Sequence, residues 1–427
     1  MTSPGLVVAD DLTGASDTGH EFAARGLRTL VVTVESAADD AATGSDVLVV
    51  DTDSRYASPE TAAAAVDRAI SAHDHDFVYK KVDSTLRGNL VPEVDAALAA
   101  TGADLALVAP ASPRNGRTTV EGYHLVDGVL VTDTDAGSDP DAPVETPHLP
   151  TRFAASAHPV VRLPIDRVAA GPETVEAALA DWAADGPVVV AADASHERHL
   201  ETLAAAAARV DAAVVYVGSA GLARYVETPP SRGGGPRPVP HRDRSVLCVV
   251  GSTSPVTREQ LADLPEPALV PLDLAAAVDA PAEASTAAAA ACATRLDHEG
   301  LAVLASAPDA DAPDRALAAG RDRGLDGATV RARVAEALGG TVERLWADDP
   351  PESLFVTGGA VAADVFATLG AVGVDLSGEA VEEGIPLGRV AGGVADGTPV
   401  VTKAGAFGGP GAIRKCAARL GGRDEFS

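Results

Sequence analysis

Aromatic side chains are scarce in this chain. Only 3% of its 427 residues are Phe, Trp or Tyr, although 46% are hydrophobic. The cores must therefore be built from Ala, Val and Leu, which suits α/β layers in which Val-rich strands lie under Ala- and Leu-rich helices. The length corresponds to two or three domains.

Cysteines and long apolar runs are also lacking. The three cysteines, Cys248, Cys292 and Cys416, are widely spaced and form no CxxC motif or Cys/His cluster, which argues against a structural zinc site and a disulfide framework. No run of about 18 apolar residues occurs, and the N-terminal segment does not read as a signal peptide. The sequence thus predicts no membrane span and a cytoplasmic location.

Basic residues are few compared with acidic ones. There are 33 Lys and Arg against 62 Asp and Glu, a formal charge of -29. Such a surface repels a phosphate backbone, so we expect no nucleic-acid partner. Almost all the cations are Arg, and this composition favours a halophile-like surface adapted to high salt. Each retained lysine is a candidate for a specific task; lysines occur at Lys80, Lys81, Lys403 and Lys415.

A Pro-, Gly- and Arg-rich segment, residues 228–244, reads as a linker. It predicts an N-terminal domain over residues 1–227 and a C-terminal domain over residues 245–427. Residues 133–150 read as a long loop within the first domain, and the Ala-rich residues 275–293 read as a helix.

Short apolar strands alternate with helical segments throughout the chain. This order predicts an α/β fold in which each domain has a mostly parallel sheet flanked by helices. Ligands then bind beyond the C-terminal ends of the strands. The strands are expected at residues 6–9, 30–34, 47–50, 77–79, 105–109, 188–191, 214–217, 246–250, 301–305, 354–357 and 399–403.

Charged residues gather where strands of the first half end. Asp10, Asp11 and Asp17 follow the first strand, where they can hold substrate hydroxyls, hold Mg²⁺ or act as a base. Capping of the next helix, expected over residues 16–25, is the alternative. Arg55, after the third strand, suits a bidentate grip on a carboxylate.

The segment FVYKKVDSTLRGNL, residues 77–90, concentrates cations, an acid and hydroxyls after one strand. Lys and Arg can neutralise a carboxylate or a phosphoryl group, and Asp83 can accept a proton from an attacking hydroxyl. A charged loop closed by local salt bridges is the alternative. Arg114 and Arg117, after the next strand, are candidates for the same cleft.

The second half carries three small-residue turns between strand and helix. They lie in GSTSPVT, residues 251–257, in VTGG, residues 356–359, and in TKAGAFGG, residues 402–409. Backbone N–H groups at helix N-termini bind anions, so together the turns favour a nucleotide. The chain has no G-x-x-x-x-G-K-[ST] motif, no G-x-G-x-x-G after the first strand and no protein-kinase signature.

These motifs, in this order, resemble the four-carbon acid sugar kinase family, which phosphorylates D-threonate, D-erythronate or 3-oxo-tetronate. The resemblance rests on DDLTGASDTG, YKKVDSTLRGN, PASPRNGRTTVEG, GSTSPVT, VTGG and TKAGAFG and runs nearly end to end. It implies a sugar-acid-binding N-terminal domain, a nucleotide-binding C-terminal domain and an active site in the cleft between them. It also implies ATP and Mg²⁺ as cofactors.

The resemblance places functional residues at matching positions. The substrate site is expected at Asp11, Arg55, Lys81, Val82, Asp83 and Ser84, with Asp83, Asp11 and Lys81 as catalytic residues. The ATP site is expected at Ser254, Gly358, Gly359, Ala360, Val361 and Gly405. Family members often carry an acidic residue and a Thr where Ala360 and Val361 stand, and a polar residue where Ala406 stands.

The resulting hypothesis is a kinase in which Arg55 and Lys81 hold the carboxylate end of the acid and Asp83 or Asp11 orients a terminal hydroxyl. One rival is a sugar-acid dehydratase or aldolase that uses the Lys and Asp cluster. The other is a non-catalytic protein that binds nucleotide or sugar acid, suggested by Ala360, Val361 and Ala406. The sequence leaves open the stereoisomer, the protein ligands of Mg²⁺ and whether the chain forms a homo-oligomer.

Overall fold

The computed structural model describes residues 3–32, 44–139, 142–228, 230–231, 235–405 and 407–423. The chain divides into two compact units, Met1–Gly235 and Pro236–Ser427, here called unit 1 and unit 2. The predicted linker, residues 228–244, includes residues 229 and 232–234, which lie outside the described part. Its bounds therefore stay a prediction.

The main sheet of unit 1 is parallel throughout its described strands. Its strands are, in spatial order, β2 (Thr29–Val32), β3 (Val47–Asp51), β1 (Gly5–Ala9), β4 (Phe77–Lys81), β11 (Val214–Gly218), β5 (Leu105–Ala109), β10 (Val188–Ala192) and β9 (Val160–Leu163). A small antiparallel sheet joins β6 (Arg117–Val120), β7 (Tyr123–Val126) and β8 (Val129–Leu130).

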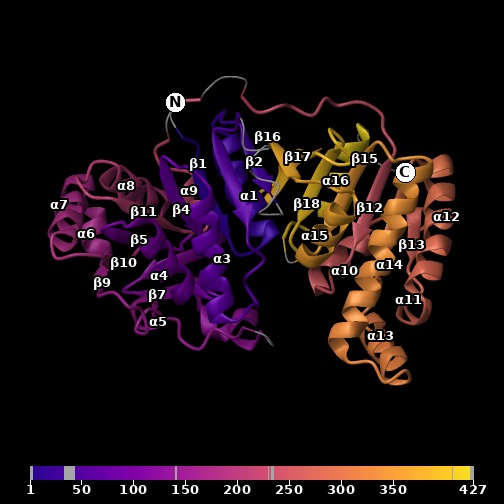
Figure 1. The fold of residues 1–427 in the computed structure, drawn as a ribbon, viewed down its shortest axis with the longest axis horizontal. Coiled ribbons are helices and arrows are strands. Elements are labelled where there is room, and N and C mark those ends of the chain that lie inside the picture. The colour runs from indigo at the N-terminus through magenta and orange to yellow at the C-terminus, as the bar shows by residue number, and fades with distance from the viewer. Residues whose placement is uncertain are drawn as a thin grey trace. The chain divides into compact units, whose positions relative to one another are not determined.

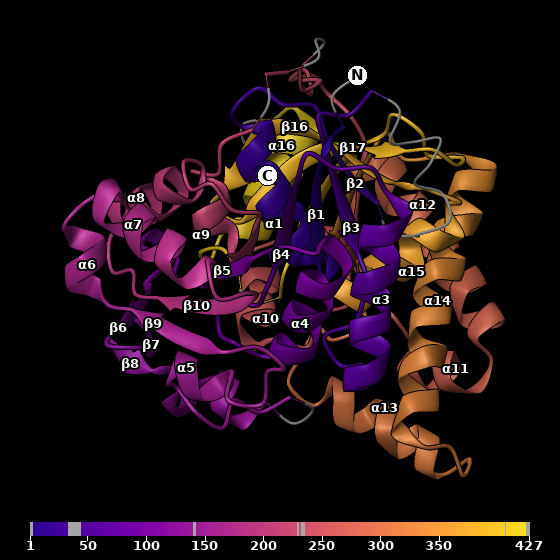
Figure 2. The same cartoon turned by 60° about the vertical axis from the view of Figure 1, so that its left-hand side comes forward.

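Helices connect the parallel strands of unit 1. They are α1 (Leu12–Ala23), α3 (Pro59–Ala72), α4 (Leu90–Thr101), α5 (Leu149–Arg152), α6 (Ile165–Ala169), α7 (Pro172–Ala183), α8 (Glu197–Ala207) and α9 (Ala220–Ala223). Figure 2 shows α3 and α4 side by side along the sheet, and they pack closely against each other. The connection from β1 through α1 to β2 runs toward one edge of the sheet, and the connection from β3 through α3 to β4 runs toward the other edge. Because such crossovers are right-handed, α1 and α3 lie on opposite faces of the sheet.

Unit 2 has a sheet that is parallel at one side and antiparallel at the other. Its strands are, in spatial order, β13 (Leu269–Pro271), β14 (Leu301–Ala305), β12 (Val246–Val250), β15 (Ser353–Thr357), β18 (Pro399–Lys403), β17 (Ile385–Ala391) and β16 (Gly373–Glu382). Its helices are α10 (Pro255–Ala262), α11 (Leu274–Asp279), α12 (Pro281–Glu299), α13 (Ala312–Arg321), α14 (Gly327–Asp348), α15 (Gly359–Thr368) and α16 (Ala412–Gly421). The antiparallel pairs are β16 with β17 and β17 with β18.

The predicted α/β class is confirmed, and so is the prediction that the cores consist mainly of Val, Leu and Ala. The first helix begins at Leu12 and not at residue 16, because Asp11 accepts a hydrogen bond from the Gly14 N–H and caps it. The helix expected over residues 275–293 is two helices, with a break at Ala280 before Pro281. Residues 33–34 of the second predicted strand lie outside the described residues.

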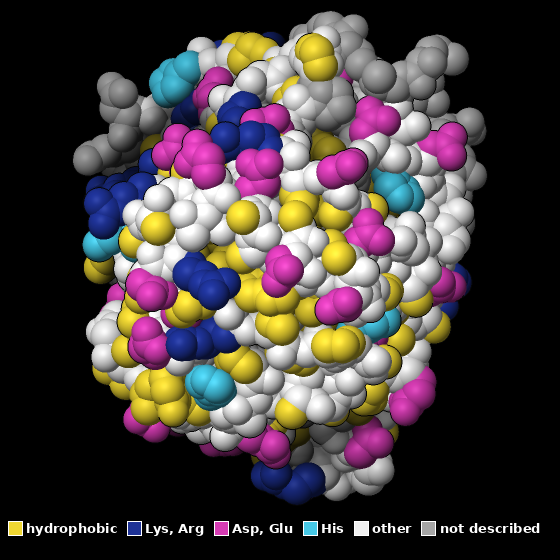
Figure 3. Space-filling model, turned by 90° about the vertical axis from the view of Figure 1, so that its left-hand side faces the viewer, with side chains coloured by type: hydrophobic (Ala, Val, Ile, Leu, Met, Phe, Trp, Pro, Cys, Tyr) yellow, Lys and Arg dark blue, Asp and Glu magenta, His cyan; other side chains and the backbone are white. Residues whose placement is uncertain are grey.

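The loop expected over residues 133–150 contains short 3₁₀ turns, Val131–Asp133 and Asp135–Ser138, and the start of α5. Within the described residues, no helix is both long and apolar enough to cross a membrane. On the face in Figure 3, Asp and Glu side chains are spread among apolar ones, with Lys and Arg in small groups between them.

Candidate functional site

The first candidate site lies where β1 and β4 end in unit 1. These strands are neighbours in register, with Ala9 opposite Lys81. Asp10 and Asp11 therefore leave the sheet beside the segment that carries Asp83. Since the carboxyl ends of parallel strands share one edge of a sheet, two motifs about 70 residues apart in sequence meet there.

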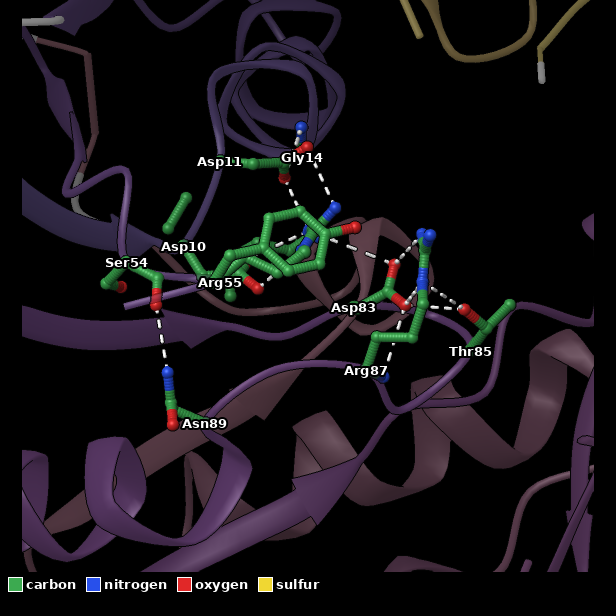
Figure 4. A network of polar contacts seen from close by, with 12 residues as sticks. Asp10, Asp11, Gly14, Ser54, Arg55, Asp83, Thr85, Arg87 and Asn89 are labelled. Atoms are coloured by element: carbon green, nitrogen blue, oxygen red, sulfur yellow. Dashed lines mark hydrogen bonds and ion pairs between the residues drawn. The ribbon is translucent and has the colours of Figure 1, made fainter. Parts of the chain in front are cut away.

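Arg55 connects the carboxylates of this edge (Figure 4). Its Nε and Nη2 donate to Asp10 at 2.8 and 2.9 Å, and its Nη1 and Nη2 donate to Asp11 at 3.0 and 2.6 Å. Burial favours the neutral form of Asp10, but Arg55, Lys81 and Lys80 outweigh it and lower the pKa of that carboxyl. Asp10 is thereby held as a carboxylate.

Asp83 forms a second pair with Arg87 at the same edge. Arg87 Nε and Nη2 donate to its two oxygens at 2.8 and 3.2 Å, and Thr85 Oγ1 donates to Oδ2. Burial raises the pKa of Asp83, but Arg55 and Arg87 outweigh it, so the pKa lies well below its usual range. The Arg87 side chain is 29% exposed against 10% for Arg55. Arg87 is thus the more accessible of the two guanidinium groups.

Lys81 lies over the first turn of α1. A Cβ at Gly14 would lie 2.5 Å from both Lys81 Nζ and Asp11 Oδ1, so no larger residue fits at Gly14 without displacing them. The ammonium and the capping carboxylate therefore share the space above the N-terminus of α1. The predicted alternative, that Asp11 caps the helix, is confirmed, and a role of Asp11 in a substrate site stays a prediction.

A buried ion pair lies under the site. Lys80 Nζ is 2.9 Å from Glu93 Oε2, and the two side chains are 0% and 2% exposed. The ammonium also donates to the carbonyls of Lys81 and Val8, and Glu93 Oε1 accepts from Ser54 Oγ at 2.5 Å. The pair thus joins β1, β4, α4 and the turn that carries Arg55.

Val82 and Ser84 contribute to the site in different ways. The Val82 side chain is buried and its N–H donates to the Gly218 carbonyl, so its side chain belongs to the core. The Ser84 carbonyl accepts from His124 Nε2 at 2.9 Å, and His124 Nδ1 lies 2.9 Å from Thr119 Oγ1. Because a carbonyl only accepts, Nε2 carries the proton and Nδ1 accepts from the threonine.

His124 was missed by sequence reasoning, and it belongs to the β6–β7 hairpin that was also missed. Burial lowers the pKa of this fully buried imidazole from 6.5 to about 4, although the Ser84 carbonyl partly opposes the change. The unfolded chain therefore binds more protons than the folded chain between these values. His124 thus stabilises the fold fully above about pH 6.5, and the contribution is lost as the pH falls toward 4.

We expect His124→Leu to lower the free energy of unfolding by about 1–3 kcal/mol at pH 7.5, because two buried polar partners lose their bonds. The difference from wild type should shrink as the pH falls from 6.5 to about 4 and should vanish or change sign near pH 4, because protonation of His124 costs the wild type about 3 kcal/mol if only this group titrates. Urea unfolding at several pH values measures it. A pH-independent difference would contradict the neutral assignment of His124.

Arg114 and Arg117 do not join this cluster. Arg114 pairs with Glu197 of α8 at 3.4 Å, and Arg117 donates to the Asn115 carbonyl within its own turn. Neither contact reaches the carboxylates of the cluster, and the expectation that both arginines face the same cleft stays a prediction. Their segment folds back on itself as the β6–β7 hairpin, which the turn at Gly116 begins with φ at +72°.

In unit 2 the three predicted turns come together. A Cβ at Gly405 would lie 3.1 Å from the Ser254 Cβ, and one at Gly358 would lie 3.3 Å from the Ser252 N. A Cβ at Gly251 would clash with the Val361 side chain. Ser254 is the N-cap of α10, Gly358 is the N-cap of α15, and Gly359 begins α15. Two helix N-termini and a glycine loop therefore converge, which is an arrangement suited to phosphate.

A mostly apolar pocket of about 400 Å³ adjoins these turns. Gly251, Thr253 and Val361 line it on the side of the turns. Its remaining lining, which includes Leu274, Ser306, Pro313, Leu317, Val330, Arg331, Val334 and Leu338, comes from α11, α13, α14 and the end of β14. A pocket of this size and character suits a heterocyclic ring.

The structure gives no side-chain position for two residues of unit 2 that the sequence analysis named. Nothing is described of the Ala360 side chain, and Ala406 lies outside the described residues. Within the described part of the chain, no group of three or more His, Cys, Asp or Glu side chains is placed to hold a metal ion.

The sequence matches two domain families. Residues 5–226 match the model of a sugar-binding N-terminal domain, and residues 247–413 match that of a nucleotide-binding C-terminal domain. The charged cluster of unit 1 lies within the first match, and the three turns of unit 2 lie within the second.

Three relatives are similar over nearly the whole chain. A D-threonate kinase of Salmonella typhimurium is 35% identical over 418 residues, 94% of this chain and 95% of the relative. A D-erythronate kinase of Heliobacterium modesticaldum is 33% identical over 96% of this chain and 95% of its own length. A 3-oxo-tetronate kinase of Methylobacterium radiotolerans is 31% identical over 94% and 96%.

Two solved structures share the fold. A Salmonella typhimurium LT2 protein superposes with a TM-score of 0.77 at 23% identity, covering 96% of this chain and 98% of that chain. A Haemophilus influenzae protein superposes with a TM-score of 0.71 at 23% identity, covering 97% and 100%.

Proposed function

Because the chain belongs to the four-carbon acid sugar kinase family, we propose that it transfers the γ-phosphoryl group of ATP to a terminal hydroxyl of a four-carbon sugar acid. Threonate, erythronate and 3-oxo-tetronate are the candidate acceptors. The observation that carries the proposal is the presence of two complementary sites in one chain. A charged strand-end cluster suits an anionic hydroxy acid, and glycine turns beside an apolar pocket suit a nucleotide.

We propose that Lys81 and Arg55 bind the carboxylate of the sugar acid. Four N–H bonds of Arg55 are directed at Asp10 and Asp11, and the second N–H of Nη1 has no acceptor among the described residues. Arg55 therefore offers one donor and not the bidentate fork expected from the sequence. Lys81, beside Asp11, supplies the second cationic contact.

We propose that Asp83, or Asp11 in its place, orients the attacking hydroxyl. Both are carboxylates fixed by guanidinium groups, so each can accept a hydrogen bond from a hydroxyl without moving. Phosphoryl transfer depends mainly on position and charge neutralisation, and a fixed carboxylate supplies the first. The backbone hydrogen bonds of Val82 and Ser84, on either side of Asp83 in the chain, fix the position of Asp83.

We propose that ATP binds unit 2 with its phosphates at Ser254, Gly358, Gly359, Ala360, Val361 and Gly405. The glycines leave room for the approach of phosphate oxygens to backbone N–H groups, and the adjoining pocket accepts the base. Mg²⁺ neutralises phosphate charge in such reactions. Asp10, Asp11 and Asp83 do not fit a protein-held metal site, because the guanidinium groups of Arg55 and Arg87 already neutralise their charge, whereas a neutral hydroxyl needs only a remaining lone pair.

The test is ADP formation from ATP and Mg²⁺ with D- and L-threonate, D- and L-erythronate and 3-oxo-tetronates, at low and high salt. We expect turnover with one or two of these acids, because a fixed charged site discriminates stereoisomers. Folded protein that forms no ADP with any acid would contradict the proposal. Borohydride trapping of Lys81 with substrate would instead support an aldolase-type enzyme.

A further inference from the structure

Lys403 is a buried lysine that the proposed reaction does not use. It ends β18 and is 1% exposed. Its Nζ donates to the carbonyls of Ala404, Gly405 and Phe407 at 2.8, 3.1 and 3.2 Å. No carboxylate of the described residues forms an ion pair with it, although burying an unpaired ammonium is costly. All three donors of the ammonium are thus directed at one loop.

Two side chains of α10 hold the described part of the same loop, residues 404–405 and 407–409. Gln260 Nε2 lies 3.0, 3.1 and 3.0 Å from the carbonyls of Phe407, Gly408 and Gly409. Thr257 Oγ1 donates to the Gly405 carbonyl at 2.8 Å. Both side chains are fully buried. The described carbonyls of the loop are therefore held from its buried side.

This arrangement fixes the direction of the loop N–H groups. In a trans peptide unit the carbonyl and the next N–H point in opposite directions. The N–H groups of Gly405 and Gly408, which follow the held carbonyls of Ala404 and Phe407, therefore point away from Lys403. The Gly409 N–H donates to Glu382 Oε2 at 2.9 Å and is not available to a ligand. The loop is built as a nest of outward N–H groups that suits an anion.

We propose that Lys403 and Gln260 are positioning residues for the nucleotide, which hold the loop carbonyls so that the Gly405 and Gly408 N–H groups face a phosphate. The inference rests on the proposed nucleotide site, because Gly405 adjoins Ser252 and Ser254 of the first turn. Lys403 acts through the loop and does not touch the phosphate. The sparing use of lysine in this chain agrees with a specific task for it.

The test uses the full chain and the variants Lys403→Met and Gln260→Met. Each introduces an unbranched side chain of similar length that has no hydrogen-bond donor. We expect ATP binding, measured by calorimetry, to weaken about 10–100-fold in each, because buried carbonyls left without partners turn the loop. The KM for the sugar acid should stay near wild type. The matched control is Arg414→Met on α16, which removes a partly exposed cation that pairs with Asp263 at the end of α10.

A pH series separates this role from general support of the fold. Burial lowers the pKa of Lys403 to about 8, while Cys416 and Glu382 act in the opposite direction. The facing charged groups are Glu382 of β16 and Cys416 and Lys415 of α16. The pKa of Glu382 is lowered and that of Cys416 is raised, so neither titrates near 8. The terminal phosphate of ATP is ionised by about pH 7.

Above about pH 8 the neutral amine has only two protons to donate, so one loop carbonyl is released. We expect ATP affinity to fall between pH 7.5 and 9.5 in wild type and in Gln260→Met, and to stay flat in Lys403→Met. Equal ATP binding in wild type and in both variants would overturn the inference. Wild type that binds no ATP would instead overturn the proposed function. If Lys403→Met does not fold, the ATP affinity of Gln260→Met alone tests the inference, and an affinity equal to that of wild type would overturn it.

Discussion

Replacing Asp83 with Asn is expected to lower kcat about 10²–10⁴-fold. Asn keeps the size of the side chain but cannot accept a proton, and it removes the negative charge that faces Arg55 and Arg87. The hydroxyl of the sugar acid would then be neither aligned nor activated. Steady-state kinetics with the acid identified by the ADP assay measures the effect.

Two Asn variants at neighbouring carboxylates serve as controls. Asp139→Asn removes a negative charge 3.4 Å from Arg87 but leaves the contacts between Arg87 and Asp83 in place, so it should change kcat much less than Asp83→Asn. Asp11→Asn keeps a helix-capping side chain, because Asn caps as well as Asp. Should kcat collapse in Asp11→Asn and survive in Asp83→Asn, Asp11 would be the orienting carboxylate.

The pH profile adds a second check on Asp83. Its pKa lies well below the usual range, because Arg55 and Arg87 outweigh the effect of burial. Asp83 thus stays ionised wherever the protein is folded, and its contribution to stability is present above about pH 4 and lost only at more acidic pH. We expect no acid limb of kcat/KM near pH 5–6 from this residue. Such a limb, absent in Asp83→Asn, would contradict the assignment.

The sequence predicted most strands of the parallel sheets, because buried parallel strands are continuous apolar runs, but it missed the partly exposed edge strands β9 and β13. One error in the bounds of a predicted strand is informative. The strand expected to end at Tyr79 continues through Lys80 and Lys81 as β4. The two charged lysines were taken to mark the end of the strand. Lys80 lies in the core instead, because Glu93 of α4 neutralises it there. Such pairing over a distance is invisible to a local pattern.

The antiparallel strands β16 and β17 and the β6–β8 sheet were missed for a related reason. A half-buried hairpin shows as alternation of apolar and polar residues, and its signal is weaker than that of a buried run. No strand was predicted in the hairpin that carries His124, and only Arg114 and Arg117 were named there as candidates. The site cluster was predictable because each of its residues follows a strand. Its supports His124 and Glu93 were not, because they come from other elements, and neither was Gln260, which holds the loop after β18 in unit 2.

The Lys80–Glu93 pair leads to the largest expected change in stability. We expect Lys80→Met and Glu93→Gln each to lower the free energy of unfolding by about 3–5 kcal/mol, because each leaves a buried charge without its partner. Lys80→Met also frees the carbonyls of Lys81 and Val8. Urea unfolding at pH 8 measures the loss, and Lys415→Met, at an exposed ion pair, should cost less than about 1 kcal/mol.

The double variant Lys80→Met, Glu93→Leu separates the cost of an orphaned charge from the value of the pair. Burial raises the pKa of Glu93 even with Lys80 present, so the pair is expensive to bury. Removing both charges should therefore recover much of the stability lost in either single variant. In Lys80→Met alone, Glu93 can bind a proton and so avoid the free-energy cost of a buried, unpaired carboxylate. A carboxyl whose pKa is raised in the folded state contributes stability at low pH, and this contribution is lost as the pH rises through the raised pKa. The stability of Lys80→Met should therefore be closer to that of wild type at pH 5.5 than at pH 8. If the double variant were no more stable than the single variants, the ion pair itself would stabilise the fold, and apolar packing could not replace it.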